Sequence, residues 1–207
     1  MKIGISGASG HLGTATVKAL AAIGGHEIVG ISRTPEKVIA PASARFGDYD
    51  APDSLAEAYA GLDRLLIIPT TSLAPGDRGR QNVAAIDAAV AAGVGHIVFF
   101  SSAGTRAADE PHIHASYYAA EQRLMRTARH WSILRMNYYA ESLIDEAKRS
   151  FAHGTLTGLA ENKVAFVSRN DLAAAAAGLL AGEGHEGAIY NGTGPAVLTG
   201  AERAAAI

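Results

Sequence analysis

The sequence contains no cysteine among its 207 residues, which excludes disulfide bonds, thiolate catalysis and zinc–thiolate sites. An excess of one charge is also lacking, since the net charge is −2, and no basic surface for nucleic acid is predicted. No apolar stretch reaches the roughly 20 residues of a membrane span, and the first residues enter a predicted strand without a signal peptide. We therefore expect a soluble, cytoplasmic protein without nucleic-acid partners or a membrane span.

Hydrophobic residues are plentiful, at 48% of the chain, which suits one globular domain with a sizeable core. Short apolar runs alternate with amphipathic segments. The runs at 65–68 and 97–100 are continuous, as is typical of strands buried on both faces of a parallel sheet. The alternation predicts an α/β fold with a doubly wound parallel sheet, formed by residues 1–207 as a single domain. In such sheets ligands bind outside the carboxyl ends of the strands.

The expected elements follow from periodicity and from glycine and proline signals. The predicted strands are 3–5, 27–31, 44–48, 65–68, 97–100, 132–135 and 164–167. The predicted helices are 12–23, 35–39, 52–60, 81–92, 116–129, 138–152 and 171–180.

A glycine-rich loop lies between the first predicted strand and the first predicted helix. The spacing of Gly7, Gly10 and Gly13 permits a tight turn, a close approach of the backbone to a diphosphate, and close packing of helix against strand. The amides of the first helical turn would then face the anion. The strand at 27–31 completes a βαβ unit, so we interpret the loop as a dinucleotide site rather than as a glycine turn of another α/β fold.

The end of the second strand distinguishes the two nicotinamide dinucleotides. An acidic residue there binds the ribose of NAD, whereas a cation accommodates the 2′-phosphate of NADP. Arg33 stands at this position, and its neighbours Ser32 and Thr34 bring no carboxylate. A guanidinium group can bind a phosphate through two parallel hydrogen bonds. We expect NADP(H) as the cofactor; the alternative is that Arg33 stacks over adenine or lies in solvent.

With these motifs the sequence resembles the NmrA-like group of atypical short-chain dehydrogenases/reductases, and within it the type 2 NAD(P)H:quinone oxidoreductases. The likeness runs from residue 1 to about residue 202. The segments that carry it are 7–13, 32–37, 47–50, 134–137, 167–173 and 184–191.

The resemblance implies a Rossmann-like domain that holds NADPH, with a small C-terminal lobe closing over a quinone cleft. Segments of about 136–165 and 187–207 would contribute to this lobe. Family members usually continue for several tens of residues further, so the lobe is expected to be truncated. Its pocket would then be incomplete or be completed by a neighbouring copy in a homodimer.

The resemblance also implies roles for individual residues. The loop residues that would line the diphosphate are Gly7, Ser9, Gly10, His11 and Leu12, with Gly13 completing the motif. Arg33 would bind the 2′-phosphate, Asp48 the adenine edge, and Thr70 with Thr71 the nicotinamide ribose.

Three further residues follow later predicted strands. Asn137 and Tyr138 would stand near the nicotinamide and the substrate, as the resemblance implies. Ser101 comes directly after the 97–100 strand, and this position suits a cofactor edge. No Gly-x-Ser-x-Gly motif surrounds Ser101, which disfavours a serine hydrolase.

Ordinary short-chain dehydrogenases use Tyr-x-x-x-Lys, in which lysine lowers the pKa of the tyrosine that exchanges a proton with the substrate. In the matching segment, Glu121 follows Tyr117 by four residues and Gln122 follows Tyr118. A carboxylate near a phenol raises the pKa of that phenol, which is the wrong direction for a base. We therefore expect no alcohol dehydrogenation by this mechanism.

Quinone reduction does not need such an acid, because a quinone accepts hydride directly and the cofactor supplies the chemistry. Water can protonate the product, so Tyr117 and Tyr118 are read as cleft lining or packing. The predicted function is hydride transfer from NADPH to a quinone, by an enzyme in which no side chain is assigned as catalytic. Two alternatives stay open: an NmrA-like redox sensor that binds the dinucleotide without turnover, and a reductase of another substrate. No metal site is expected, because His112 and His114 lack a suitable acidic partner.

Overall fold

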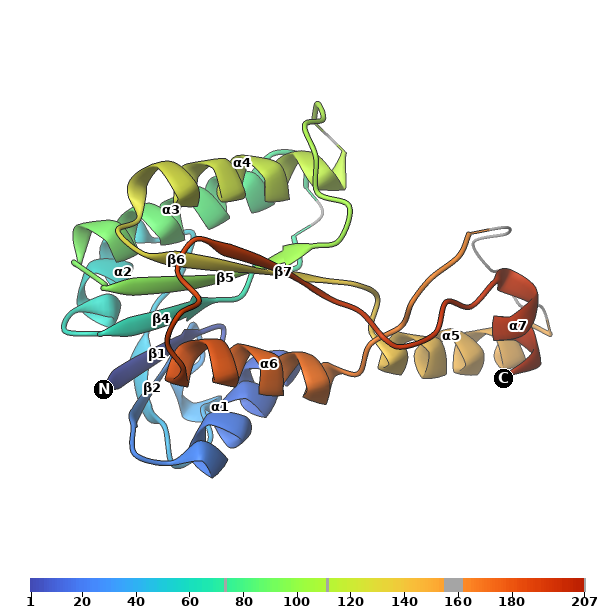
Figure 1. Cartoon of the computed structure of the whole chain (residues 1–207), viewed down its shortest axis with the longest axis horizontal. Helices are drawn as coiled ribbons and strands as arrows, with labels where there is room; N and C mark the ends of the chain where they lie inside the picture. The colour runs from blue at the N-terminus through green and yellow to red at the C-terminus, as the bar shows by residue number, and fades with distance from the viewer. Residues whose placement is uncertain (73, 111, 155–161, 207) are drawn as a thin grey trace.

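A computed structural model of the chain describes residues 1–72, 74–110, 112–154 and 162–206. Its described strands form one parallel sheet in the order β3-β2-β1-β4-β5-β6-β7 (Figure 1). The strands are β1 (Lys2–Ser6), β2 (Glu27–Ser32), β3 (Ser43–Phe46), β4 (Arg64–Ile67), β5 (His96–Ser102), β6 (Trp131–Met136) and β7 (Ala188–Gly192). The doubly wound parallel sheet predicted from the sequence is confirmed.

Helices cover both faces of this sheet. On one face, α1 (His11–Ile23) and α6 (Arg169–Ala181) pack against the strands. On the other face lie α2 (Pro52–Tyr59), α3 (Asp77–Ala91) and α4 (Ile113–Thr127). A single 3₁₀ turn, η1 (Pro35–Lys37), follows β2. Each face therefore has its own apolar core, and the sheet separates the two.

Local sequence explains why these elements form where they do. Helix α1 buries Leu12, Thr16 and Leu20 on one face, at the spacing of a helix that packs against a sheet. It ends at Gly24, which has a φ of 76° and adopts a conformation that glycine takes without strain. The β1 and β4 strands are buried almost throughout, as their apolar runs predict.

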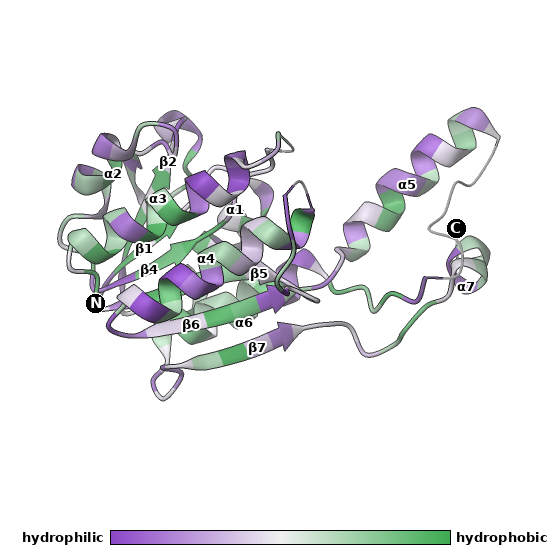
Figure 2. Ribbon diagram, turned by 90° about the horizontal axis from the view of Figure 1, so that it is seen from above, coloured by the Kyte–Doolittle hydropathy of each residue, from purple (hydrophilic) through white to green (hydrophobic). Residues whose placement is uncertain are grey.

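Helices α5 (Ala140–His153) and α7 (Gly200–Ala205) lie apart from the layered body (Figures 1 and 2). No residue of α5 is buried. Helix α7 begins with a capping box, in which Thr199 and Glu202 each accept a hydrogen bond from the other's backbone. These two helices form the extension on which the proposed substrate lobe would be built. None of the helices in the described ranges combines the length and the apolar character needed to cross a membrane.

Two sequence predictions about the C-terminal part are wrong. Residues 164–167 form no strand; Val164 and Val167 make only isolated bridges, to Leu198 and Tyr139, because this segment lies beyond the sheet. Conversely, Ala188–Gly192 is the edge strand β7 of the main sheet, although 187–207 was assigned to the lobe. Only the part of that segment beyond β7 extends away from the body. The predicted helix 138–152 is present as α5, whereas part of the lobe segment, 155–161, lies outside the described residues.

Candidate functional site

The glycine loop is fixed to the neighbouring strand by its own backbone. The amides of Gly7 and Ala8 donate to the carbonyl oxygen of Ile31 in β2, at 2.9 and 3.1 Å. Gly7 has a φ of 95°, which favours glycine. A Cβ atom on Gly13 would overlap the carbonyl oxygen of Gly7 and lie 2.7 Å from the Cα of Ala8. Gly13 therefore lets α1 begin directly against the loop, as the motif requires.

Several backbone amides of this loop have no acceptor in the described part of the chain. They belong to Ser9, His11, Leu12 and Gly13. Gly10, the N-cap of α1, offers no side-chain cap, and the first turn carries no acidic residue. Unpaired amides at a helix N-terminus form a site for an anion. The loop residues therefore fit the diphosphate that the sequence predicted, and they do so through the backbone.

The end of β2 lies beside this loop. The Ser9 and Ser32 hydroxyl groups are 2.6 Å apart, and the Thr34 hydroxyl donates to Ser9 at 3.3 Å. Between Ser32 and Thr34, Arg33 has an exposed side chain. Among the described residues, no hydrogen bond or ion pair holds Arg33. Its guanidinium is thus available to a ligand at the edge where the loop amides lie.

The loop after β3 is joined to helix α3 by polar side chains. Asp50 accepts from Arg80 at 2.7 Å and from Gln81 at 2.8 Å. These two hydrogen bonds lower the pKa of the Asp50 carboxyl, with a smaller contribution from the charge of Arg33. Because Asp50 is already paired with residues of α3, it leaves Arg33 free for a phosphate.

The residues predicted to hold the ribose and adenine groups lie in the loops after β3 and β4. Thr70, three positions after the end of β4, donates to Gln81 at 2.5 Å, and Thr71 is exposed. Asp48 is half-buried and accepts from the amide of Asp50 at 3.0 Å. The structure therefore places Asp48, Thr70 and Thr71 at the carboxyl edge, and the Asp50–Gln81 contact links Asp48 with Thr70.

Ser101 lies in the interior of the fold. It belongs to β5, is fully buried, and donates its hydroxyl to Glu121 at 2.6 Å. The Glu121 carboxylate, 1% exposed, also accepts two hydrogen bonds from Arg135, at 2.9 and 2.6 Å. This buried cluster joins α4 to β5 and β6. The Ser101 hydroxyl is therefore engaged in the interior, and the role expected for Ser101 at the cofactor stays a prediction.

The environment of Tyr117 also differs from the sequence expectation. Burial raises the pKa of the Tyr117 phenol, and the neighbouring Arg78 guanidinium opposes that rise. Arg78 lies over the tyrosine ring, 5.5 Å from its centre. The carboxylate of Glu121 is not the cause, because it is engaged by Arg135 and Ser101. A buried phenol with a raised pKa remains a poor base at neutral pH.

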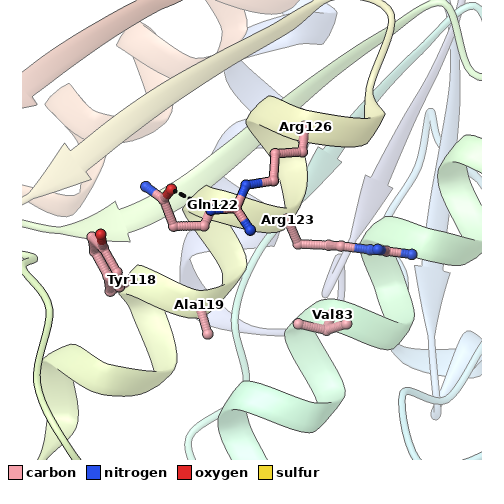
Figure 3. Close-up of a pocket in the computed structure, with 6 residues that line it drawn as sticks. All are labelled: Val83, Tyr118, Ala119, Gln122, Arg123 and Arg126. Carbon is pink, nitrogen blue, oxygen red and sulfur yellow. Dashed lines mark hydrogen bonds between the residues drawn. The ribbon is translucent and has the colours of Figure 1, made fainter.

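Tyr118 points to a different part of the surface. It lines an open pocket between α3 and α4, together with Val83, Gln122 and Arg123 (Figure 3). The two adjacent tyrosines therefore have separate environments. Tyr117 is packed inside the body, whereas Tyr118 lies on the outer side of the helix pair.

Asn137 and Tyr138 follow β6 at the same edge of the sheet as the other predicted residues. The amide of Asn137 donates to Gly192 at 3.0 Å, and the Asn137 side chain accepts from the amide of Tyr138 at 2.8 Å. The Tyr138 side chain is 58% exposed. Both residues stand where the chain leaves the body towards α5, which suits a position beside a substrate cleft.

The two histidines of the polar loop have structural partners. His112 is the N-cap of α4 and accepts from the amide of His114 at 3.2 Å. Their rings stack with centres 4.9 Å apart. The described residues contain no group of three His, Cys, Asp or Glu side chains that could hold a metal ion.

Sequence reasoning did not identify two buried groups near this edge. One is the Ser101–Glu121–Arg135 cluster described above. The other is Arg78 on α3, which is 9% exposed. The cluster has no local motif, since the partners of Glu121 are 14 and 20 positions away. Arg78 has none either, since its contact is with Tyr117 on another helix.

Comparison with known proteins agrees with this geometry. The chain is 33% identical to quinone oxidoreductase 2 of Escherichia coli strain K12, over 95% of this chain and 70% of that protein. It is 32% identical to an NAD(P)H azoreductase of Xenophilus azovorans, over 78% of this chain and 56% of that protein. The crystal structure of Citrobacter sp. triphenylmethane reductase complexed with NADP(H) superimposes with a TM-score of 0.85 at 30% identity. That match covers 96% of this chain and 72% of the reductase.

A family model described as NAD(P)H-binding matches residues 7–183. The matched range starts at the first loop glycine and ends just after α6, so it includes all the site residues discussed above. The free loop amides and the unpaired Arg33 lie within it and fit a nicotinamide dinucleotide. The chain therefore belongs to the NAD(P)H-binding family.

Proposed function

We propose that this protein is an NADPH-dependent reductase that transfers hydride directly to a quinone. The observation that carries the proposal is the pairing of an anion site with a free cation at one sheet edge. The unpaired amides of the glycine loop suit the diphosphate of NADPH, and the exposed Arg33 suits its 2′-phosphate. Relatives named as quinone, azo and triphenylmethane reductases support a reductase of this type.

The residues that would hold the cofactor follow from the geometry and from the resemblance. The loop from Gly7 to Gly13 would bind the diphosphate through its amides, and Arg33 would bind the 2′-phosphate. Asp48 would contact adenine, while Thr70 and Thr71 would hold the nicotinamide ribose. When bound, NADPH supplies the hydride, so the protein's part is binding and orientation.

The substrate side requires little acid–base chemistry from the chain. The position four residues after Tyr117 holds Glu121, which is locked in a buried ion pair. Burial also keeps the phenol of Tyr117 protonated at neutral pH. Asn137 and Tyr138 would line the substrate side of the cleft, and water would protonate the product.

A redox sensor that binds the dinucleotide without turnover is the second candidate. It is favoured by the lack of a lysine four residues after Tyr117 and by α5, in which no residue is buried. NADPH oxidation by purified protein with a simple quinone, an azo dye or no acceptor distinguishes the candidates. Oxidation with quinone alone supports the proposal, and oxidation with only the azo dye indicates another reductase. Tight NADPH binding without oxidation supports the sensor.

Arg33→Ala should weaken NADPH binding about 10- to 100-fold, because each hydrogen bond to a charged group contributes about 1.5–3 kcal/mol. NADH lacks the 2′-phosphate, so its affinity should barely change. Titration of both cofactors by fluorescence measures the two dissociation constants. Lys37→Ala, which removes an exposed cation in η1, is the matched control and should have far less effect. Equal losses for NADPH and NADH would contradict the assignment of Arg33.

Tyr117→Phe and Tyr118→Phe should each keep quinone reduction within about tenfold of the parent rate. The reason is that direct hydride transfer needs no phenolic acid, whereas general acid–base groups contribute roughly 100- to 10,000-fold. Steady-state kcat with a simple quinone checks this. A loss of several orders of magnitude in either variant, with NADPH affinity intact, would refute direct transfer.

A further inference from the structure

A buried arginine near the start of α3 has part of its guanidinium group unpaired. Arg78 is 9% exposed, and its Nε has no hydrogen-bond acceptor among the residues that the structure describes. No carboxylate of the described ranges forms an ion pair with it. One side of the group is covered by the Tyr117 ring. An unpaired buried cation costs several kcal/mol, so a partner from outside the protein would relieve that cost.

A second unpaired polar side chain lies one helical turn further along α3. Asn82 is fully buried, and neither its Oδ1 nor its Nδ2 has a hydrogen-bond partner in the described ranges of the chain. Residues four apart lie on the same face of a helix, so Arg78 and Asn82 form one polar strip. Buried polar groups are normally hydrogen bonded. Of these two residues, Arg78 is the one that lines a cavity.

Arg78 also reaches a cavity at the carboxyl edge of the sheet. The cavity measures about 70 Å³ and lies between the segment after β4 and the start of α4. Its lining includes Arg78, Ser72, Gly76, Glu110, His112 and Ser116. The Glu110 carboxylate accepts from the amide of Gly76 at 3.3 Å and is not paired with Arg78. Arg78 is therefore a cation of this cavity that no described carboxylate pairs, although its side chain also contacts the Tyr117 phenol.

The cavity adjoins the residues proposed for the nicotinamide end of the cofactor. Ser72 directly follows Thr71, and Thr70 is hydrogen bonded to Gln81, three positions after Arg78. The cavity opens to solvent, so an oxygen-bearing edge of a larger molecule can enter it and reach Arg78. A substrate at the nicotinamide could place one oxygen there.

We propose that Arg78 binds the substrate oxygen on which negative charge develops during reduction. This inference rests on the proposed quinone reductase function and names the group that stabilises its product anion. Hydride transfer breaks one carbon–hydrogen bond of the dihydronicotinamide and brings two electrons to the quinone. The transferred hydrogen forms an O–H bond at one quinone oxygen. Both carbon–oxygen double bonds become single bonds as the ring becomes aromatic, and the other oxygen carries the negative charge until a proton from water forms the second O–H bond.

Arginine suits this task for two reasons. Its guanidinium stays charged at any working pH and donates several hydrogen bonds. Hydrogen bonds to a forming anion are stronger than those to a neutral carbonyl, so they favour the charged product over the ground state. The aromatic ring of Tyr117 holds the guanidinium from one side, which fixes its orientation towards the cavity.

A binding experiment tests the site without turnover. 4-Nitrophenol, a coloured aromatic ring with one ionisable oxygen, is titrated over pH in the presence of the protein and NADP⁺. The intact protein should lower the pKa of the bound phenol by about one unit or more, because a cation near an anion shifts pKa by about 1–3 units. Arg78→Met should remove this shift while NADP⁺ affinity is retained. The same shift in both proteins, or no binding by either, would overturn the assignment.

Kinetics with a simple quinone provide the second measurement. Arg78→Met should lower kcat/KM about 100-fold or more, the usual effect of removing one oxyanion donor. The kcat/KM of Arg78→Lys should lie between those of the intact protein and Arg78→Met. Added guanidinium should restore part of the rate of Arg78→Ala. Arg123→Met, in the outer pocket (Figure 3), is the matched control and should leave the rate unchanged.

The two proposals fail in different ways. If the intact protein oxidises no NADPH with quinones, the proposed function is wrong, and the phenolate titration still tests Arg78. If the intact protein turns over and Arg78→Met matches its rate, the Arg78 proposal is wrong and the function stands.

Discussion

Gly13→Ala is expected to reduce NADPH affinity about 100-fold or more, since a displacement of about 1 Å in a positioned group can cost that much. The added Cβ would overlap the carbonyl oxygen of Gly7 and would lie 2.7 Å from the Cα of Ala8. Both contacts are with backbone, so no side chain can move aside. Helix α1 must shift away from the loop, and the amides that face the diphosphate shift with it. Such overpacking should also cost about 1–3 kcal/mol of stability.

Gly178→Ala is the matched control for this variant. Gly178 also lies inside a helix, α6, but no atom lies within 4 Å of a Cβ built on it. The substitution should stabilise the protein by up to about 1 kcal/mol through helix propensity, with unchanged NADPH affinity. Fluorescence titration and thermal unfolding measure both quantities. If Gly13→Ala binds NADPH as tightly as the parent, the loop is not the diphosphate site.

Glu121→Ala should lower the free energy of unfolding by about 3 kcal/mol, at the lower end of the range for breaking a buried ion pair. The carboxylate is 1% exposed and accepts hydrogen bonds from Arg135 and Ser101. Its removal leaves the Arg135 guanidinium and the buried Ser101 hydroxyl without their acceptor. The lower end applies because the Arg135 side chain is 25% exposed and water can reach part of it.

Denaturant unfolding of two further variants separates this effect from a general loss of packing. The double variant Glu121→Leu with Arg135→Met should recover most of the stability, because a buried ion pair can be replaced by apolar residues at little cost. Asp87→Ala breaks the exposed pair with Arg123 and should change stability much less. If Glu121→Ala is as stable as the parent, the buried cluster does not hold α4 to the sheet.

The central part of the fold follows from local signals in the sequence. Continuous apolar runs such as 65–68 predicted strands buried on both faces, and the structure confirms β4 and β5 there. The glycine spacing predicted a loop whose helix starts against a strand, and Gly13 has that geometry. The family match confirms the prediction of a nicotinamide dinucleotide cofactor. These features depend on residues close together in the chain, so short patterns identify them.

The errors arise where long-range pairing decides the structure. Strand β7 lies at the sheet edge, and its Ile189 and Tyr190 are 41% and 37% exposed, so its pattern is not that of a buried strand. The apolar residues Val164 and Val167 read as a strand, yet they pack beside the start of α5 and the segment before α7. Local sequence does not show which strand a segment pairs with, and that pairing is what distinguishes β7 from residues 164–167.

The candidate site shows the same division. The anion-binding loop and Arg33 were predicted from spacing, and the structure brings them to one edge. Ser101 was expected at the cofactor, a role that stays a prediction; its partner Glu121 lies 20 positions away and draws the hydroxyl into the interior. Arg78 gave no signal, because its significance depends on the contact between α3 and Tyr117 of α4.

The most direct test of the proposed function is a single turnover with isotopically labelled cofactor. The protein is first bound to NADPH, or to NADPH carrying deuterium in place of the transferred hydrogen, and is then mixed rapidly with excess quinone. We expect one hydroquinone for each bound NADPH, formed more slowly with the deuterated cofactor, since cleavage of that bond is the hydride transfer itself. Stable NADPH fluorescence after mixing with quinone, with the cofactor still bound, would contradict the proposal.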